Sequence, residues 1–188
     1  MENQREVQIS AEMTPNPNTL KFNVDRLLIE SGSYDFPDRA KAEASYLASE
    51  LFDIAGVEGV FIGTSFITVS KQTEKMWQDL APTLIEKLKA VLNSDKEIVS
   101  KDAVPSANDT SGSSEIEQKI RAVLDTEIRP AVARDGGDII FYGYKDGIVT
   151  LHLQGACSSC PSSIMTLKMG VENRLKQIVP EIREVVQV

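Results

Sequence analysis

The sequence predicts an α+β protein made of two small α/β modules joined by a flexible linker. Runs rich in β-branched and aromatic residues alternate with segments whose apolar residues recur at helical spacing. These runs form two groups, separated at residues 94–114 by a stretch dominated by Ser, Asp, Asn and Lys. Such a stretch cannot bury enough apolar surface to offset its ordering entropy. We therefore predict modules at residues 1–93 and 115–188.

The strands of the first module are expected on either side of a proline-rich turn. Strand-like stretches at residues 7–13 and 20–28 flank residues 14–18, where two prolines and two asparagines exclude a helix. Two further short runs, at residues 57–62 and 66–69, are separated by Gly-Thr-Ser and predict a hairpin. The turn is first a structural feature, although as an exposed rigid loop it would also suit contact with other proteins.

Two helices are expected in the first module. Asp38 can cap a helix that carries Ala42 and Leu51 on its apolar face. A second helix is expected after Thr73, with leucines at helical spacing, and Pro82 is expected to bend it.

The second module has clear boundaries for each of its elements. Ser114 and Glu117 form a capping box at the start of a helix, which Pro130 must kink or restart. Gly136 supplies the backbone freedom that ends this helix, so the surrounding Asp-Gly-Gly-Asp is interpreted as a helix stop and strand entry. Strands at 138–144 and 148–154 follow, joined by Asp-Gly, a strong hairpin signal.

A third helix and a last strand complete this module. The helix follows the loop at residues 155–160 and ends before Pro180, and residues 182–188 read as a strand, giving the order α-β-β-α-β. Met165 and Met169, four positions apart on that helix, are expected to pack in the core.

Composition argues against several classes of protein. A net charge of −8 is unlike that of a nucleic-acid binder, and no apolar run approaches the ~20 residues that span a bilayer, so we expect neither nucleic-acid nor membrane partners. Residues 1–6 lack the features of a signal or transit peptide, from which we expect a cytoplasmic protein. No convincing Ser/His/Asp set can be assembled around a single histidine, which argues against hydrolase chemistry.

Cys157 and Cys160 are the only cysteines in the chain. They are separated by two residues directly before a helical pattern, and Pro161 suits the first helical position, which makes Cys160 the expected N-cap. Backbone N–H groups and the helix dipole would then favour thiolate at Cys160. In a reducing compartment such a pair is typically metal-binding or catalytic, and an incidental pair is the weaker interpretation.

Three functional interpretations of the pair remain. A thioredoxin-like redox pair would need a βαβ context that the predicted order does not suggest. A zinc site would need two more ligands, and His152, the only histidine, falls on the strand face opposite the apolar residues. The third is a cofactor bridged by two chains, each giving two thiolates, which suits an iron–sulfur cluster. Ligand count favours bridging.

The residues around the pair also resemble a known family. Residues 134–138, Arg-Asp-Gly-Gly-Asp, and residues 153–164, Leu-Gln-Gly-Ala-Cys-Ser-Ser-Cys-Pro-Ser-Ser-Ile, closely resemble the C-terminal domain of NifU and of Nfu-type iron–sulfur scaffold and carrier proteins. Residues 13–22, Met-Thr-Pro-Asn-Pro-Asn-Thr-Leu-Lys-Phe, are similar to the signature of the Nfu N-terminal domain. The two matches occur in the order that longer family members show.

The resemblance implies a specific function. Cys157 and Cys160 would bind a [4Fe–4S] cluster, with [2Fe–2S] as the alternative, bridged between two protomers and passed to apo-proteins. The implied partners are apo iron–sulfur client proteins and upstream cluster donors. The chain would be a homodimer when loaded and a monomer when apo. The resemblance implies a carrier without turnover chemistry of its own and not an enzyme. It would act late, because this sequence contains none of the additional cysteine-bearing modules with which full-length NifU assembles clusters.

Overall fold

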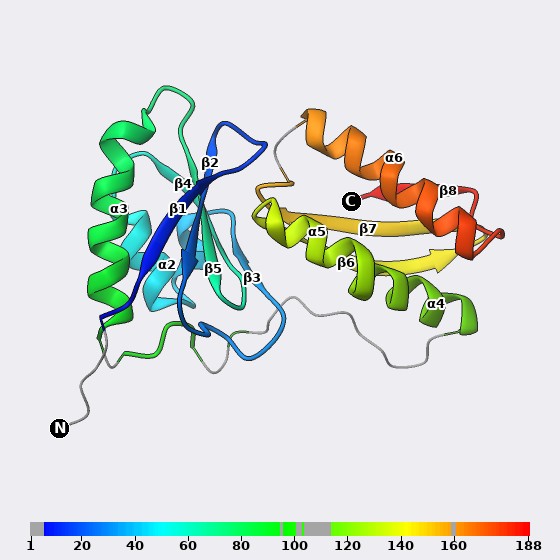
Figure 1. Ribbon diagram of the computed structural model, residues 1–188, viewed down its shortest axis with the longest axis horizontal. Helices are drawn as coiled ribbons and strands as arrows, with labels where there is room; N and C mark the ends of the chain where they lie inside the picture. The colour runs from blue at the N-terminus through cyan, green and yellow to red at the C-terminus, as the bar shows by residue number, and fades with distance from the viewer. Residues whose placement is uncertain (1–5, 95, 101–102, 104–113, 159–160) are drawn as a thin grey trace.

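The computed structural model is an α+β protein with two domains (Figure 1). It describes residues 6–94, 96–100, 103, 114–158 and 161–188, and the side chains of residues 161–164 are not described. Each domain has its own sheet and its own apolar core. The predicted fold class is therefore confirmed. Within the described residues, no helix combines the length and the apolar character needed to cross a bilayer.

The N-terminal domain is built on a five-stranded antiparallel sheet with the strand order β1-β2-β5-β4-β3. The strands are β1 (Ile9–Met13), β2 (Thr19–Val24), β3 (Tyr34–Phe36), β4 (Val57–Ile62) and β5 (Phe66–Lys71). The predicted hairpin of β4 and β5 is confirmed. The short edge strand β3 was not predicted, because three residues are too few to show the alternation of apolar and polar residues that indicates a strand.

Three helices accompany this sheet: α1 (Arg39–Ala42), α2 (Tyr46–Phe52) and α3 (Trp77–Leu92). The one helix expected after Asp38 is two helices. Asp38 caps α1 through the backbone N–H of Lys41, and Ser45 caps α2 through that of Ala48. Serine competes for backbone hydrogen bonds within a helix and favours a new start. The expected last helix is α3, which contains Pro82.

Part of the predicted linker packs onto the N-terminal domain. Val99 is buried in that domain's core, and the backbone N–H of Ser100 donates to the carbonyl of Ala44 at 2.9 Å. Residues 95, 101–102 and 104–113 lie outside the described residues. The boundaries at 94 and 114 stay a prediction, with α3 ending at Leu92 and the next helix beginning at Glu115.

The C-terminal domain begins with a long helical segment. It consists of α4 (Glu115–Val123), the π-helical turn η1 (Leu124–Ile128) and α5 (Arg129–Arg134). The capping box of Ser114 and Glu117 is present. Pro130 restarts the helix as predicted, because it lies in the first turn of α5 directly after η1. Gly136, at φ 85°, ends the segment in the left-handed region that favours glycine.

Strands β6 (Gly137–Lys145) and β7 (Ile148–Gly155) follow, then α6 (Pro161–Ile178) and β8 (Glu184–Gln187). The sheet order is β6-β7-β8, with β6 antiparallel and β8 parallel to β7. The order α-β-β-α-β is confirmed, but β7, α6 and β8 form a βαβ unit. The argument against a redox pair from the absence of such a unit was therefore wrong, because strand order along the chain does not fix strand direction.

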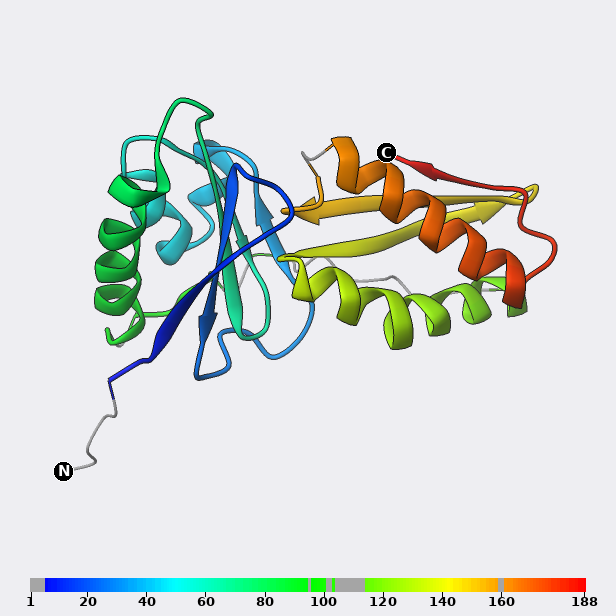
Figure 2. The same cartoon turned by 45° about the horizontal axis from the view of Figure 1, so that its top comes forward.

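One face of the N-terminal sheet packs against one end of the C-terminal domain (Figures 1 and 2). Alternation along β2 places Leu20 and Phe22 in the helix-side core and leaves Lys21 on the opposite face. That opposite face of the sheet turns toward the end of the C-terminal domain where α5, β6 and β7 meet (Figures 1 and 2). Lys21 and Thr68 lie on it and are 8% and 1% exposed. The end of the C-terminal domain that faces this sheet also carries the cysteine loop.

Candidate functional site

Cys157 lies in the loop between β7 and α6, buried at the edge of the C-terminal core. Its side chain is 4% exposed. A Cβ built on Gly137 would lie 3.0 Å from the Cys157 sulfur, so the absence of a side chain there is what lets the sulfur approach β6. Cys160, with its predicted N-cap role, lies outside the described residues, although α6 does begin at Pro161 as predicted.

Two hydrogen bonds, one of them from a side chain, fix the start of the cysteine loop. The N–H of Ala156 donates to the carbonyl of Gly136 at 3.1 Å, which ties the loop to the turn between α5 and β6. The Ser158 hydroxyl donates to the carbonyl of Gly155 at 2.9 Å. Gly155 itself has φ 65°, and an added Cβ would lie 2.7 Å from the Gly136 carbonyl oxygen. This position therefore requires glycine.

The N-terminal domain forms one wall of the site. Asn16, in the turn expected at residues 14–18, is 4% exposed and donates from its side-chain amide to the carbonyl of Ala156 at 3.2 Å. A cavity of about 360 Å³ lies at this contact, lined by Pro15, Asn16, Asp135, Ala156, Cys157, Thr166 and Leu167. The turn thus contacts the chain's own cysteine loop, one residue before Cys157.

A buried lysine holds the other side of the domain contact. The Lys21 ammonium donates to the carbonyls of Ala133 and Arg134, at 2.9 and 3.2 Å, where α5 ends. A cation is favourable at a helix C-terminus, where carbonyls lack partners. Burial lowers the pKa of Lys21, and the carboxylates of Glu12 and Asp135 oppose this shift.

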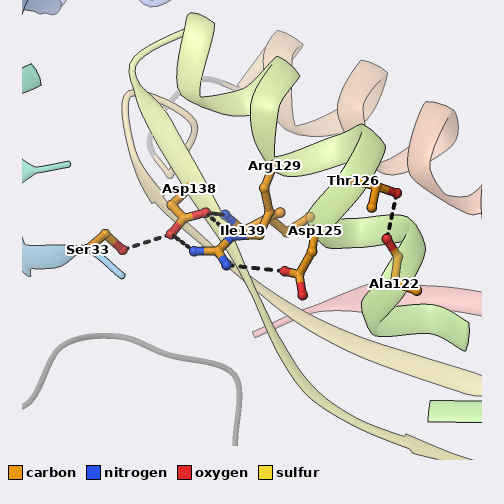
Figure 3. Close-up of polar contacts among 7 residues, drawn as sticks. All are labelled: Ser33, Ala122, Asp125, Thr126, Arg129, Asp138 and Ile139. Carbon is orange, nitrogen blue, oxygen red and sulfur yellow. Dashed lines mark hydrogen bonds and ion pairs between the residues drawn. The ribbon is translucent and has the colours of Figure 1, made fainter. Parts of the chain in front are cut away.

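Asp138, the second aspartate of the Asp-Gly-Gly-Asp motif, links three elements (Figure 3). Its carboxylate accepts two hydrogen bonds from Arg129, at 2.8 and 2.7 Å, and one from the hydroxyl of Ser33 in the N-terminal domain at 2.8 Å. Hydrogen bonding to this carboxylate is the main cause that raises the pKa of Arg129. The predicted helix stop at Gly136 is confirmed, and the ion pair between α5 and β6 adds to it.

Asp35, on β3, faces the cysteine loop from the N-terminal domain. It lines a second cavity, of about 470 Å³, together with Gly155 and Ser158. Burial raises the pKa of Asp35, while a backbone hydrogen bond from Gly155 and the charges of His152 and Lys41 oppose the shift. The N-terminal domain therefore places a carboxyl group beside the loop.

His152 lies on β7, where its ring nitrogen is 2.6 Å from the carbonyl oxygen of Val188. Within the described part of the chain, no three His, Cys, Asp or Glu side chains come together in a way that would hold a metal ion. Sequence reasoning identified the cysteine loop but missed Lys21, Asn16, Asp35 and Arg129. The only signal for Lys21 was a polar residue alternating with buried apolar neighbours along β2.

Comparison with known proteins matches both domains. Residues 9–95 match the protein family described as "Scaffold protein Nfu/NifU N terminal", and residues 120–186 match the family described as "NifU-like domain". A solved NifU-like protein from Saccharomyces cerevisiae is 29% identical, covering 54% of this chain and 92% of its own, with a TM-score of 0.48.

Two relatives align along nearly the whole chain. The human NFU1 iron–sulfur cluster scaffold homolog, named mitochondrial, is 43% identical over 96% of this chain and 71% of its own length. Its counterpart from Drosophila sechellia, also named mitochondrial, is 44% identical over 98% of this chain and 66% of its own.

These names contradict the expectation of a cytoplasmic protein. That expectation relied on the composition of residues 1–6, and the absence of a targeting pattern there does not fix a compartment. The family resemblance, in contrast, is confirmed by both domain matches and by the human relative. With both domain models matched in this order and a relative 43% identical along nearly the whole chain, the chain belongs to the Nfu family, as an Nfu N-terminal domain followed by a NifU-like domain.

Proposed function

We propose that this chain carries an iron–sulfur cluster, held between two copies through Cys157 and Cys160 of each, and passes it to apo-proteins. The observation that carries the proposal is the cysteine pair, which contains every cysteine of the chain and precedes α6. The relatives are named iron–sulfur cluster scaffolds, which supports a cluster as the cargo and a role without turnover chemistry.

The number of ligands supports a second copy. An iron–sulfur cluster is normally held by four thiolates, and one chain offers two. The described residues provide no other group that would hold a metal. Four thiolates suit both [4Fe–4S] and [2Fe–2S] clusters. We propose [4Fe–4S], which the family resemblance implies, with [2Fe–2S] as the alternative that an iron count would reveal.

Loading and release require the cysteine loop to open. Cys157 is 4% exposed, so its sulfur cannot reach a cluster shared with a second chain until its surroundings move. The cavity that Cys157 lines gives the loop room on the side of the N-terminal domain. An upstream donor would load the site, and dissociation of the dimer would remove half of the ligands at once.

Transfer to a client is a ligand exchange. As each iron–sulfur bond to Cys157 or Cys160 breaks, a bond from iron to a client thiolate forms. The proton lost by the incoming thiol ends on the departing cysteine, so no electron is transferred and no external reductant is needed. Thiolates are the reacting species in such exchanges.

A second candidate function is that of a dithiol–disulfide oxidoreductase. The βαβ unit of β7, α6 and β8 favours it, because a Cys-x-x-Cys pair before the helix of such a unit is typical of redox proteins. This function predicts turnover with a disulfide substrate and needs neither iron nor a second copy.

Transfer to apo-aconitase separates the two. The anaerobically loaded chain should restore aconitase activity, and Cys160→Ser should not. At Cys157, which is part of the core, a serine would also disturb packing, so thermal unfolding accompanies any test of that position. Ser158→Ala, which removes a hydrogen bond of the same loop but no sulfur, controls for disturbance of the loop and should transfer clusters where Cys160→Ser does not. Turnover of a disulfide by a chain that takes up no iron would instead establish the oxidoreductase.

A further inference from the structure

Helix α6 presents an uncharged, methionine-rich face to solvent. Met165 and Met169 are 69% and 62% exposed, so the expectation that they pack in the core was wrong. Leu167 and Val171 mark the buried face of α6 at helical spacing, and each methionine lies two positions before one of them, on the other side of the helix. Residues four apart share a helix face. The exposed residues on this side are Met165, Thr166, Met169, Gly170 and Asn173, which we call the methionine stripe.

The charges of α6 lie beside the methionine stripe and are engaged within the domain. Lys168 pairs with Glu184 at 3.6 Å, and Arg174 pairs with Glu127 through two hydrogen bonds of 2.7 and 2.8 Å. A Cβ added to Gly170 would meet no atom within 4 Å, so the middle of the methionine stripe is open surface. Exposed methionines in a contiguous group are typical of binding surfaces.

We propose that the methionine stripe is the surface on which a second copy of this chain docks when the two share a cluster. This inference rests on the proposed function, which requires two copies at one site. Helix α6 begins at Pro161, directly after the cysteine pair. Met165 and Met169 therefore lie about 6 and 12 Å along the helix axis from its start. A two-fold axis through the shared cluster brings the starts of both α6 helices together. The methionine stripes of the two copies, which begin near these starts, then lie close to each other.

The net charge of the chain also favours the methionine stripe as the contact between identical chains. Each chain carries a net charge of −8, so two copies repel each other on average. A two-fold interface is self-complementary, because the same patch serves both partners. An uncharged patch meets its own copy without like-charge repulsion, which makes the methionine stripe suited to a second copy of the chain.

Introducing a charge into the stripe tests the inference. In a two-fold interface Met169→Glu places one carboxylate on each copy, and like charges there should weaken the loaded dimer by about tenfold or more. Met76→Glu is the matched control, since Met76 is 60% exposed but lies at the start of α3 in the other domain. After anaerobic loading, light scattering over a concentration series gives the dimer dissociation constant, and iron per chain is measured in parallel. Thermal unfolding checks that both variants fold.

We expect the wild type and Met76→Glu to load as dimers of equal affinity. Met169→Glu should dimerise about tenfold or more weakly and hold less iron per chain at the same concentration. An unchanged dissociation constant for Met169→Glu overturns the inference and leaves the proposed function standing. An unchanged dimer combined with slower transfer to apo-aconitase also overturns it, because clients would then occupy the stripe. A wild type that loads as a monomer overturns the proposed function and this inference together.

Discussion

Lys21 and Thr68 are directly paired across β2 and β5, and both side chains donate hydrogen bonds to the turn that ends α5. The Thr68 hydroxyl reaches the carbonyl of Gly136 at 2.7 Å, and Lys21 reaches that of Ala133 at 2.9 Å. The carbonyl of Gly136 also accepts from Ala156, in the cysteine loop. The N-terminal sheet thus holds the turn on which the cysteine loop rests.

Removing the Lys21 ammonium should loosen the contact between the domains. Lys21→Met leaves the carbonyls of Ala133 and Arg134 without their charged donor, and a lost hydrogen bond to a charged group costs about 1.5–3 kcal/mol. Small-angle X-ray scattering should show a larger radius of gyration for this variant. Lys71→Met is the control, because Lys71 is also buried but donates within its own domain. An equal expansion of both variants would show that Lys21 has no special part in docking.

The contact between the domains should strengthen in acid. Burial raises the pKa of Asp35 above 3.8, so the docked state binds a proton more tightly than the undocked one. The stabilisation is complete below the ordinary pKa and is lost as pH rises through the raised value. Scattering from pH 7 toward about pH 4 should therefore show a more compact chain.

Asp35→Asn supplies the control for this pH dependence. The amide carries no charge to desolvate, so this variant should be compact already at neutral pH and respond less to acid. A variant that keeps the full acid response would assign that response to other carboxylates.

Gly137 should not tolerate a side chain. In Gly137→Ala the new Cβ would lie 2.5 Å from the carbonyl oxygen of Gln154 and 3.0 Å from the Cys157 sulfur. Overpacking of this kind typically costs about 1–3 kcal/mol of the free energy of unfolding. Gly143→Ala, on the same strand, meets nothing within 4 Å and should keep the stability of the wild type. Equal denaturation midpoints for the two variants would contradict this packing.

The Asp138–Arg129 pair should matter more for stability than exposed pairs do. The Asp138 side chain is 9% exposed, and Asp138→Asn leaves Arg129 without its bidentate partner. Breaking a buried pair that leaves a charge uncompensated costs about 3–5 kcal/mol. The loss here should stay below about 3 kcal/mol, because Arg129 is 26% exposed and keeps Asp125 as a partner at 3.2 Å. Urea unfolding monitored by circular dichroism measures the loss. Glu127→Gln, in an exposed pair with Arg174, should cost less than about 1 kcal/mol.

Local signals predicted most elements of the fold. The Ser114–Glu117 capping box and the Asp146-Gly147 turn each act within a few residues, and both are present, the latter with φ of 53° and 84°. The second helix start at Ser45 and the strand β3 were missed because their signals are short. The direction of β8 was not predicted, since it depends on how α6 crosses the sheet.

The cysteine loop was predicted because its chemistry is contiguous in sequence. Its surroundings were not, because Asn16 meets Ala156 across 140 positions and Lys21 meets Ala133 across 112. The alternation of apolar and polar residues along β2 indicates that Lys21 lies on a polar face of the sheet. It does not indicate that the C-terminal domain covers that face. The exposure of Met165, in contrast, could have been predicted, because Leu167 and Val171 mark the buried face of α6 and Met165 lies on the other side.

Anaerobic reconstitution with iron and sulfide tests the central claim most directly. The mass of the loaded species is measured together with iron and sulfide per chain. A cluster bridged by Cys157 and Cys160 of two copies predicts a dimer with about two irons and two sulfides per chain for [4Fe–4S], or about one of each for [2Fe–2S]. A monomer that holds a complete cluster, or a chain that binds no iron, would contradict the account.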